Sequence, residues 1–238
     1  MANNAPPSSE QDQKGVSRLD LGAALGLVGA IVAIVIPISF VLLATYNPGG
    51  FFKFVGSLVE VTSLLVLAGA ILLLLSLFVY RRSFAALRKV DDRFLLASIL
   101  CIIGTIGFLL LVIAGAVAAG NSSSLVACTQ GKPSQILSCL KSGQPLGAYT
   151  AIAGFEFVLV GIFGLILGLL SAGSRFHRGG YTVGGLLYGV LLLAAIGPFI
   201  SLLTPVPGIE YVVFVLPAVS IAAPAMVLIA SRSLFEFA

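Results

Sequence analysis

One acidic residue, Glu156, lies inside a run of apolar residues that is long enough to cross a bilayer. The run is AIAGFEFVLVGIFGLILGLL, residues 151–170. An ionised carboxylate in hydrocarbon costs about 3 kcal/mol or more unless it faces a cavity or a partner, so an intramembrane acid is a functional candidate. No Lys or Arg lies within the apolar runs to pair with it. We therefore expect Glu156 to be neutral for much of the time.

Three roles for Glu156 remain open at this point. As a neutral acid, it can donate a hydrogen bond to a carbonyl freed by a proline, or to the hydroxyl group of Thr105, Tyr188 or Ser220. As an ionisable group between bent helices, it can bind a proton or a cation. As a contact group, it can meet another subunit of a membrane assembly. The first role is structural, the second belongs to transport and the third to assembly.

Two of the three cysteines, Cys128 and Cys139, lie in a polar loop between apolar runs, residues 120–146. Disulfides persist on the oxidising side of a cell membrane, so we predict a Cys128–Cys139 bridge that closes this loop outside the cell. Two thiols without a nearby His or acid make a poor metal site. The triplet that begins at Asn121 matches the N-glycosylation acceptor pattern, which makes Asn121 a candidate for modification.

A basic stretch, YRRSFAALRKVDDRF, follows the second apolar run at residues 80–94. Apolar residues recur in it at intervals of three or four, which predicts an amphipathic helix lying along the inner membrane surface. Its five basic residues are candidates for contact with anionic lipid or a partner. They are Arg81, Arg82, Arg88, Lys89 and Arg93. In the alternative interpretation, these charges only fix the orientation of the chain in the membrane.

The composition indicates what kind of element must position these groups. The chain has 238 residues, of which 59% are hydrophobic and 9% charged, against roughly 25% charged in an ordinary soluble domain. Six apolar runs are long enough to span about 30 Å of hydrocarbon as helices. They cover about residues 21–45, 57–80, 94–119, 147–172, 181–203 and 210–231. The runs are continuously apolar, without the alternation of barrel strands, so we predict an all-α, polytopic bundle of six transmembrane helices.

The predicted domain organisation is simple. Residues 1–18 are polar and rich in Pro and Ser, which predicts a disordered cytoplasmic tail. Residues 19–238 then form a single transmembrane domain. Ten of the 13 Lys and Arg residues fall on one side of the membrane when the connections are assigned alternately, and three fall on the other. The positive-inside rule therefore places both termini in the cytoplasm of a cell-membrane protein.

Glycines predict how the helices pack. Gly154, Gly161 and Gly168 recur every seven residues along the fourth apolar run, and small residues four apart occur in the first and fifth runs. Such stripes let two helices approach closely. We expect them to form contact faces, either within the chain or in self-association or contact with other membrane subunits.

The sequence lacks the motifs that metal binding, nucleotide binding and metalloprotease activity would need. The chain has one histidine, His177, outside the apolar runs, and it contains neither an HExxH motif nor a Walker A motif. We therefore expect no metal, no cofactor and no enzymatic activity. The net charge of +4 follows from the topology, and we expect no nucleic-acid partner.

Two segments carry a resemblance to a known family. SFAALRKVDDRFLLASILCIIGTIGFLLL, residues 83–111, and VLPAVSIAAPAMVLIAS near the C-terminus resemble a family of uncharacterised archaeal integral membrane proteins with about six spans. The resemblance implies an archaeal cell membrane, and it assigns no activity, cofactor or functional residue.

Two functions from different classes agree with these observations. The first is a non-catalytic membrane protein, a scaffold or accessory subunit of a larger assembly. The alternative is a small proton- or cation-linked transporter or channel that uses Glu156. The small number of polar groups inside the apolar runs favours the first, because a substrate pathway normally needs several of them.

Overall fold

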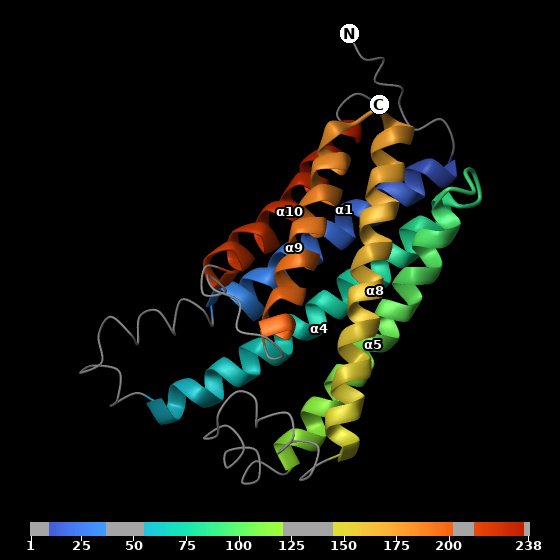
Figure 1. Ribbon diagram of the computed structural model, residues 1–238. Helices are drawn as coiled ribbons and strands as arrows, with labels where there is room; N and C mark the ends of the chain where they lie inside the picture. Colours follow the sequence, from blue (N-terminus) through green and yellow to red (C-terminus); the bar gives the residue numbers. More distant parts are fainter. Residues whose placement is uncertain (1–9, 37–54, 121–144, 202–211, 236–238) are drawn as a thin grey trace.

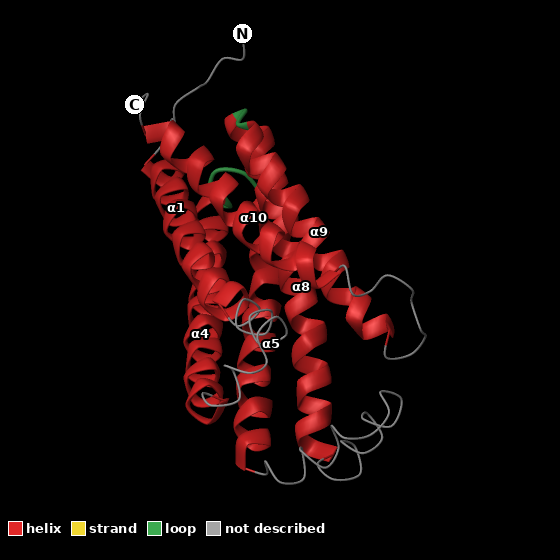
Figure 2. Cartoon of the chain, turned by 90° about the vertical axis from the view of Figure 1, so that its left-hand side faces the viewer, coloured by secondary structure: helices red, strands yellow, loops and turns green. Residues whose placement is uncertain are grey.

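The computed structural model describes residues 10–36, 55–120, 145–201 and 212–235 (Figure 1). Within these ranges the chain is helical apart from two short turns, as Figure 2 shows, so the predicted all-α class is confirmed. The helices are α1 Glu10–Ala30 with a π-helical turn η1 Ile31–Val35, α4 Val55–Leu87, α5 Phe94–Gly120, α8 Pro145–Phe176, α9 Gly179–Ser201 and α10 Val212–Phe235.

Five of the six helices are long and apolar enough to cross a membrane, judged by length and composition. The exception is α9, in which the apolar stretch found among the described residues, Gly179–Ala194, is shorter. The structure thus supports a multi-pass membrane protein, which agrees with the predicted class.

The six helices form a closed ring. Each helix packs against its neighbours along the chain, and α1 also packs against α10, which closes the ring. The chain alternates in direction, so the start of α1, the α4–α5 turn, the α8–α9 turn and the end of α10 meet at one end of the bundle (Figure 1). We call this the charged end. Apart from Glu156, the charged side chains that the structure describes all lie in residues 10–20, 81–93, 175–178 and 232, close to this end.

The first helix begins earlier than we expected. Helix α1 starts at Glu10, so the predicted disordered tail through residue 18 is wrong from residue 10 onward. Asp12 and Val16 are 1% and 0% exposed, and the buried positions continue at Leu19 and Ala23 with helical spacing. The Pro/Ser-rich composition ends before Glu10, and the next turns bury one face of the helix against the ring.

The basic stretch forms no separate surface helix. Helix α4 continues through it to Leu87, and α5 begins at Phe94. The apolar residues Phe84, Leu87 and Phe94 are fully buried in the core, and the rings of Phe84 and Phe94 stack with centroids 6.1 Å apart. The predicted amphipathic helix on the membrane surface is therefore wrong, because its apolar residues cover the end of the bundle instead.

The glycine stripe of the fourth apolar run packs inside the ring, as the predicted contact face. A Cβ atom built on Gly161 would lie 2.5 Å from Cα of Gly104 on α5, and one on Gly154 would lie 2.9 Å from the carbonyl oxygen of Gly107. Only glycine permits backbones to approach this closely. Gly168 makes room for the ring of Phe84, so this stripe is occupied within the chain and is not free for self-association.

The turn between α8 and α9 uses a left-handed residue. His177 has a φ of 49° and follows Phe176, the last residue of α8. A residue in this conformation commonly ends a helix. The turn is short, and it holds α8 and α9 side by side.

Three residues of the predicted external loop, Asn121, Cys128 and Cys139, lie outside the described residues. The disulfide and the glycosylation site therefore stay predictions.

Candidate functional site

Glu156 lies on α8 and faces away from the ring. Its side chain is exposed, in a stripe with Tyr149 and Phe163, which are 59% and 48% exposed. These three residues are seven apart and therefore share one face of the helix. The apolar part of α8 begins at Tyr149, so Glu156 lies about 10 Å inside the span by helical rise. We call Tyr149, Glu156 and Phe163 the α8 outer stripe.

The glycines of α8 explain why the acid faces outward. Successive residues of an α-helix are about 100° apart, so Glu156 lies roughly 200° around the axis from Gly154. Gly154 touches the backbone of α5, and Gly185 of α9 packs against Leu169 on another side of α8. The direction left for Glu156 is the outer surface of the bundle.

Of the three hydroxyl groups that we considered as partners of Glu156, two donate hydrogen bonds elsewhere and the third is buried in the core. Thr105 donates to the carbonyl oxygen of Cys101 at 2.8 Å, and Ser220 donates to that of Pro217 at 2.9 Å. Tyr188 is 8% exposed and belongs to the core cluster. Among the residues that the structure describes, the side chain of Glu156 has no hydrogen bond and no ion pair, so the expected internal hydrogen bond of its carboxyl group is not formed there.

The ring encloses a cavity of about 130 Å³ to which all six helices contribute. Its lining is apolar apart from the hydroxyl groups of Ser76, Tyr188 and Ser220. Ser76 also donates to the carbonyl oxygen of Gly22 at 2.7 Å. A space of this size can hold water where polar groups bind it. None of the residues that line it is charged, and Glu156 is not among them.

An ionic clamp joins three segments at the charged end. Asp12 of α1 accepts two hydrogen bonds, both 3.1 Å long, from Nε and Nη2 of Arg175 near the end of α8. Nη1 of Arg175 lies 3.5 Å from Oδ2 of Asp91 in the α4–α5 turn. Asp12 is 1% exposed and Arg175 is 22% exposed, so water competes little for the Asp12 carboxylate. We call Asp12, Arg175 and Asp91 the ionic clamp.

The last helix is attached at the same end. Arg232 of α10 lies 3.5 Å from Asp20 of α1, measured from Nε to Oδ1. Arg178 donates to the carbonyl oxygen of Ser233 at 3.1 Å. The hydroxyl group of Tyr181 in α9 contacts that of Ser231 at 3.1 Å in the core. These contacts fix the position of α10 against both of its neighbours in the ring.

Sequence reasoning missed the ionic clamp, although a signal was present. Asp12 was assigned to a disordered tail and Arg175 was counted only toward orientation. The helical spacing of Asp12, Val16, Leu19 and Ala23 would have extended the first helix and placed Asp12 on its buried face. A buried acid then requires a basic partner at the same end of the bundle.

The five basic residues that we predicted to contact lipid or a partner divide into those that line a pocket and those that do not. Arg82 and Lys89 line a pocket between α1 and α4, together with Lys14 and Arg18. Arg81, Arg88 and Arg93 do not line it. Arg81 lies over the ring of Phe78 at 5.8 Å from its centroid, and Arg93 lies 4.0 Å from Asp91.

Within the described ranges, no three side chains of His, Cys, Asp or Glu come together in a way that could hold a metal ion. Comparison of the chain with protein-family models, with curated proteins and with solved structures gives no match.

Proposed function

We propose that the protein is a non-catalytic subunit of a membrane assembly, which contacts another membrane protein through the α8 outer stripe. The observation that carries the proposal is the outward direction of Glu156 from within an apolar span. A partner helix with a hydrogen-bond donor or a basic group would remove the cost of exposing this acid to lipid, about 3 kcal/mol.

The residues around Glu156 suit a helix contact. Tyr149 lies two helical turns before Glu156 and Phe163 two turns after it, on the same face of α8. The neighbouring Phe157 is 38% exposed. Aromatic side chains offer large contact areas at helix interfaces. A partner helix laid along this stripe would cover the two aromatic rings and the carboxyl group together.

The transport alternative has less support from the geometry. Glu156 lies outside the ring, whereas a path across the membrane would use the cavity enclosed by the six helices. The groups that could bind a solute in that cavity are hydroxyls. The alternative predicts that Glu156→Gln abolishes solute movement while folding is retained.

The orientation and location form part of the same proposal. Ten of the 13 Lys and Arg residues belong to the segments near the charged end, which the positive-inside rule assigns to the cytoplasm together with both termini. Helix α9 has 23 residues, enough to rise about 34 Å and form the sixth span. The resemblance to archaeal membrane proteins favours an archaeal cell membrane.

Photo-crosslinking in native membranes tests the proposed contact. A photoreactive amino acid at Phe163 should give one discrete crosslinked product, because this position lies on the α8 outer stripe. The matched control is Leu193 on α9, which is 71% exposed to the outside of the ring and should give none. Glu156→Gln keeps a hydrogen-bonding group and should retain the product, whereas Glu156→Leu should lose it.

Two results would count against this function. Equal crosslinking at positions 163 and 193 would show that α8 has no preferred neighbour. Loss of proton or cation flux in Glu156→Gln liposomes, with an unchanged melting temperature, would favour the transporter instead.

A further inference from the structure

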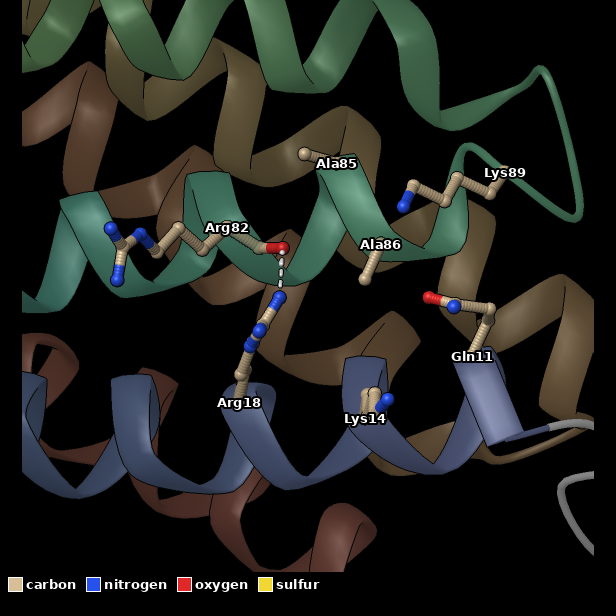
Figure 3. A pocket seen from close by; sticks show the side chains of 7 residues that line it. All are labelled: Gln11, Lys14, Arg18, Arg82, Ala85, Ala86 and Lys89. Carbon is tan, nitrogen blue, oxygen red and sulfur yellow. Dashed lines mark hydrogen bonds between the residues drawn. The ribbon is translucent and has the colours of Figure 1, made fainter.

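A basic pocket lies between α1 and α4 at the charged end (Figure 3). Its volume is about 330 Å³. Basic side chains supply four of the seven residues that line it, and none of the seven is acidic. The lining residues are Gln11, Lys14, Arg18, Arg82, Ala85, Ala86 and Lys89.

The two helices are held firmly beneath this pocket. The hydroxyl group of Ser83 donates to the carbonyl oxygen of Gly15 at 2.7 Å. A Cβ atom on Gly15 would lie 2.5 Å from the side chain of Leu87, so the helices are in close contact there. Ala85 and Ala86 leave space above this contact, and longer side chains at their positions would fill it.

The basic side chains come from both sides of the pocket. Figure 3 shows Arg18 reaching from α1 to α4, where it donates to the carbonyl oxygen of Arg82 at 3.2 Å. Lys89, in the turn after α4, and Gln11 on α1 extend beside Ala86. The guanidinium group of Arg82 lies over the ring of Phe78, 4.7 Å from its centroid.

Nearby acids neutralise little of this charge. Three of them are engaged away from the pocket, namely Asp12 and Asp91 with Arg175, and Asp20 with Arg232. Glu10 pairs with Lys14 in an exposed ion pair. Within the described part of the chain, no ion pair joins Arg18, Arg82 or Lys89 to an acid. Arg18 and Lys89 therefore offer two cations without an acidic partner to an anion in the pocket, whereas the guanidinium group of Arg82 lies over Phe78.

The position of the pocket along the helix axes indicates whether the anion belongs to a lipid. On α1, the exposed positions change from Lys14 and Arg18 to Leu21 and Val28, which are 52% and 49% exposed. These residues are spaced by three, four or seven and therefore follow one face of the helix. The change from basic to apolar marks the boundary between lipid headgroups and hydrocarbon.

Helix α4 shows the same change on the side that lines the pocket. Arg82 and Leu75 are seven apart on α4, and Ile71 continues this face. Leu75 and Ile71 are 44% and 46% exposed. Two helix faces thus run from the basic pocket into the apolar part of the bundle.

From these observations we propose that the pocket binds the phosphate of an anionic lipid headgroup. The phosphate receives hydrogen bonds from Arg18 and Lys89, which are free of acidic partners, while the acyl chains lie along the exposed apolar residues of α1 and α4. The inference depends on the bundle being in a membrane, and it is independent of a partner at the α8 outer stripe.

Native mass spectrometry of the full-length, delipidated protein in detergent tests the proposal. The protein is titrated with phosphatidylglycerol and with phosphatidylcholine of the same chain length, and inorganic phosphate is added as a competitor. We expect one phosphatidylglycerol to bind at least tenfold more tightly than phosphatidylcholine. Inorganic phosphate at about 10 mM should displace little of it, because it lacks the acyl chains.

Matched variants separate a site from general charge attraction. Arg18→Gln/Lys89→Gln removes two charges from the pocket, and Arg81→Gln/Arg88→Gln removes two charges from residues that do not line it. The first pair should weaken phosphatidylglycerol binding at least tenfold and the second less than twofold. Ala85→Phe keeps every charge and should also weaken binding, because its ring fills the pocket.

Three outcomes would overturn the proposal. These are absence of phosphatidylglycerol binding to the wild-type protein, equal weakening by the two double variants, and full displacement by inorganic phosphate. The last outcome would assign the pocket to free phosphate. Each variant is first compared with the wild type by melting temperature, and Ala85→Phe preserves the test if a charge variant does not fold.

Discussion

Substitution of Asp12 by alanine removes the central carboxylate of the ionic clamp. Two charge-assisted hydrogen bonds from Arg175 are lost, and each bond to a charged group contributes about 1.5–3 kcal/mol. Arg175 keeps its ion pair with Asp91 and is 22% exposed, so water and Asp91 recover part of this loss. We therefore expect Asp12→Ala to lower the free energy of unfolding by about 3 kcal/mol, at the low end for a broken buried ion pair.

The assay is equilibrium unfolding in mixed micelles, followed by circular dichroism and arranged as a double-mutant cycle. Arg175→Met alone should also be strongly destabilising, because it leaves the Asp12 carboxylate buried without its main partner. The double variant Asp12→Ala/Arg175→Met removes both charged groups and closes the cycle. It should lose less stability than the sum of the two single variants, with a coupling energy of about 2–3 kcal/mol.

The control for this cycle is Glu10→Ala, on the same helix. Glu10 forms an exposed ion pair with Lys14, so its removal should leave stability unchanged within error. Additive effects of the two clamp substitutions, or a loss below about 1 kcal/mol for Asp12→Ala, would refute the assignment of Asp12 to a buried clamp.

Three further predictions use the same protein. Gly161→Ala should lower the free energy of unfolding by about 1–3 kcal/mol, because the new Cβ atom would lie 2.5 Å from Cα of Gly104. The control is Gly189→Ala, whose Cβ atom would have its nearest neighbour at 3.9 Å. This substitution should change the free energy of unfolding by less than about 0.5 kcal/mol. Ser83→Ala should cost about 1 kcal/mol by removing the 2.7 Å hydrogen bond to Gly15, whereas the exposed Ser17→Ala should not. In denatured protein without reductant, mass spectrometry after alkylation should show one modified thiol, Cys101, and three after reduction; three modified thiols without reductant would disprove the Cys128–Cys139 disulfide.

The positions of the helices and one of their contact faces could be predicted from the sequence. Apolar length alone predicted helices in all six places, and the heptad spacing of Gly154, Gly161 and Gly168 predicted the contact face that meets α5. The ends of the helices were less accessible. The polar residues of α1 and α4 near the charged end resemble a tail and a surface segment until the neighbouring helices that bury them are known.

The direction of Glu156 also required the structure. Its place inside an apolar run was evident from the sequence, but whether it faced the ring or the outside depended on where α5 and α9 pack on α8. The glycine spacing could have given this answer, because a residue two positions after a contact glycine lies on the opposite side of the helix. The basic pocket was inaccessible for another reason, since its residues come from segments more than 60 positions apart.

The ionic clamp has a consequence for the order of biosynthesis. Asp12 and Arg175 are separated by 163 residues, so at about 5–20 residues per second the ribosome needs roughly 8–30 s to supply the arginine after the acid. During that interval Asp12 has no Arg175 to neutralise it, and α1 lacks α10, one of its two neighbours in the ring. Helix α1 is made before the other described helices and is thus among the last to be fully packed, and a nascent chain arrested before Arg175 should leave the first turns of α1 exposed to water.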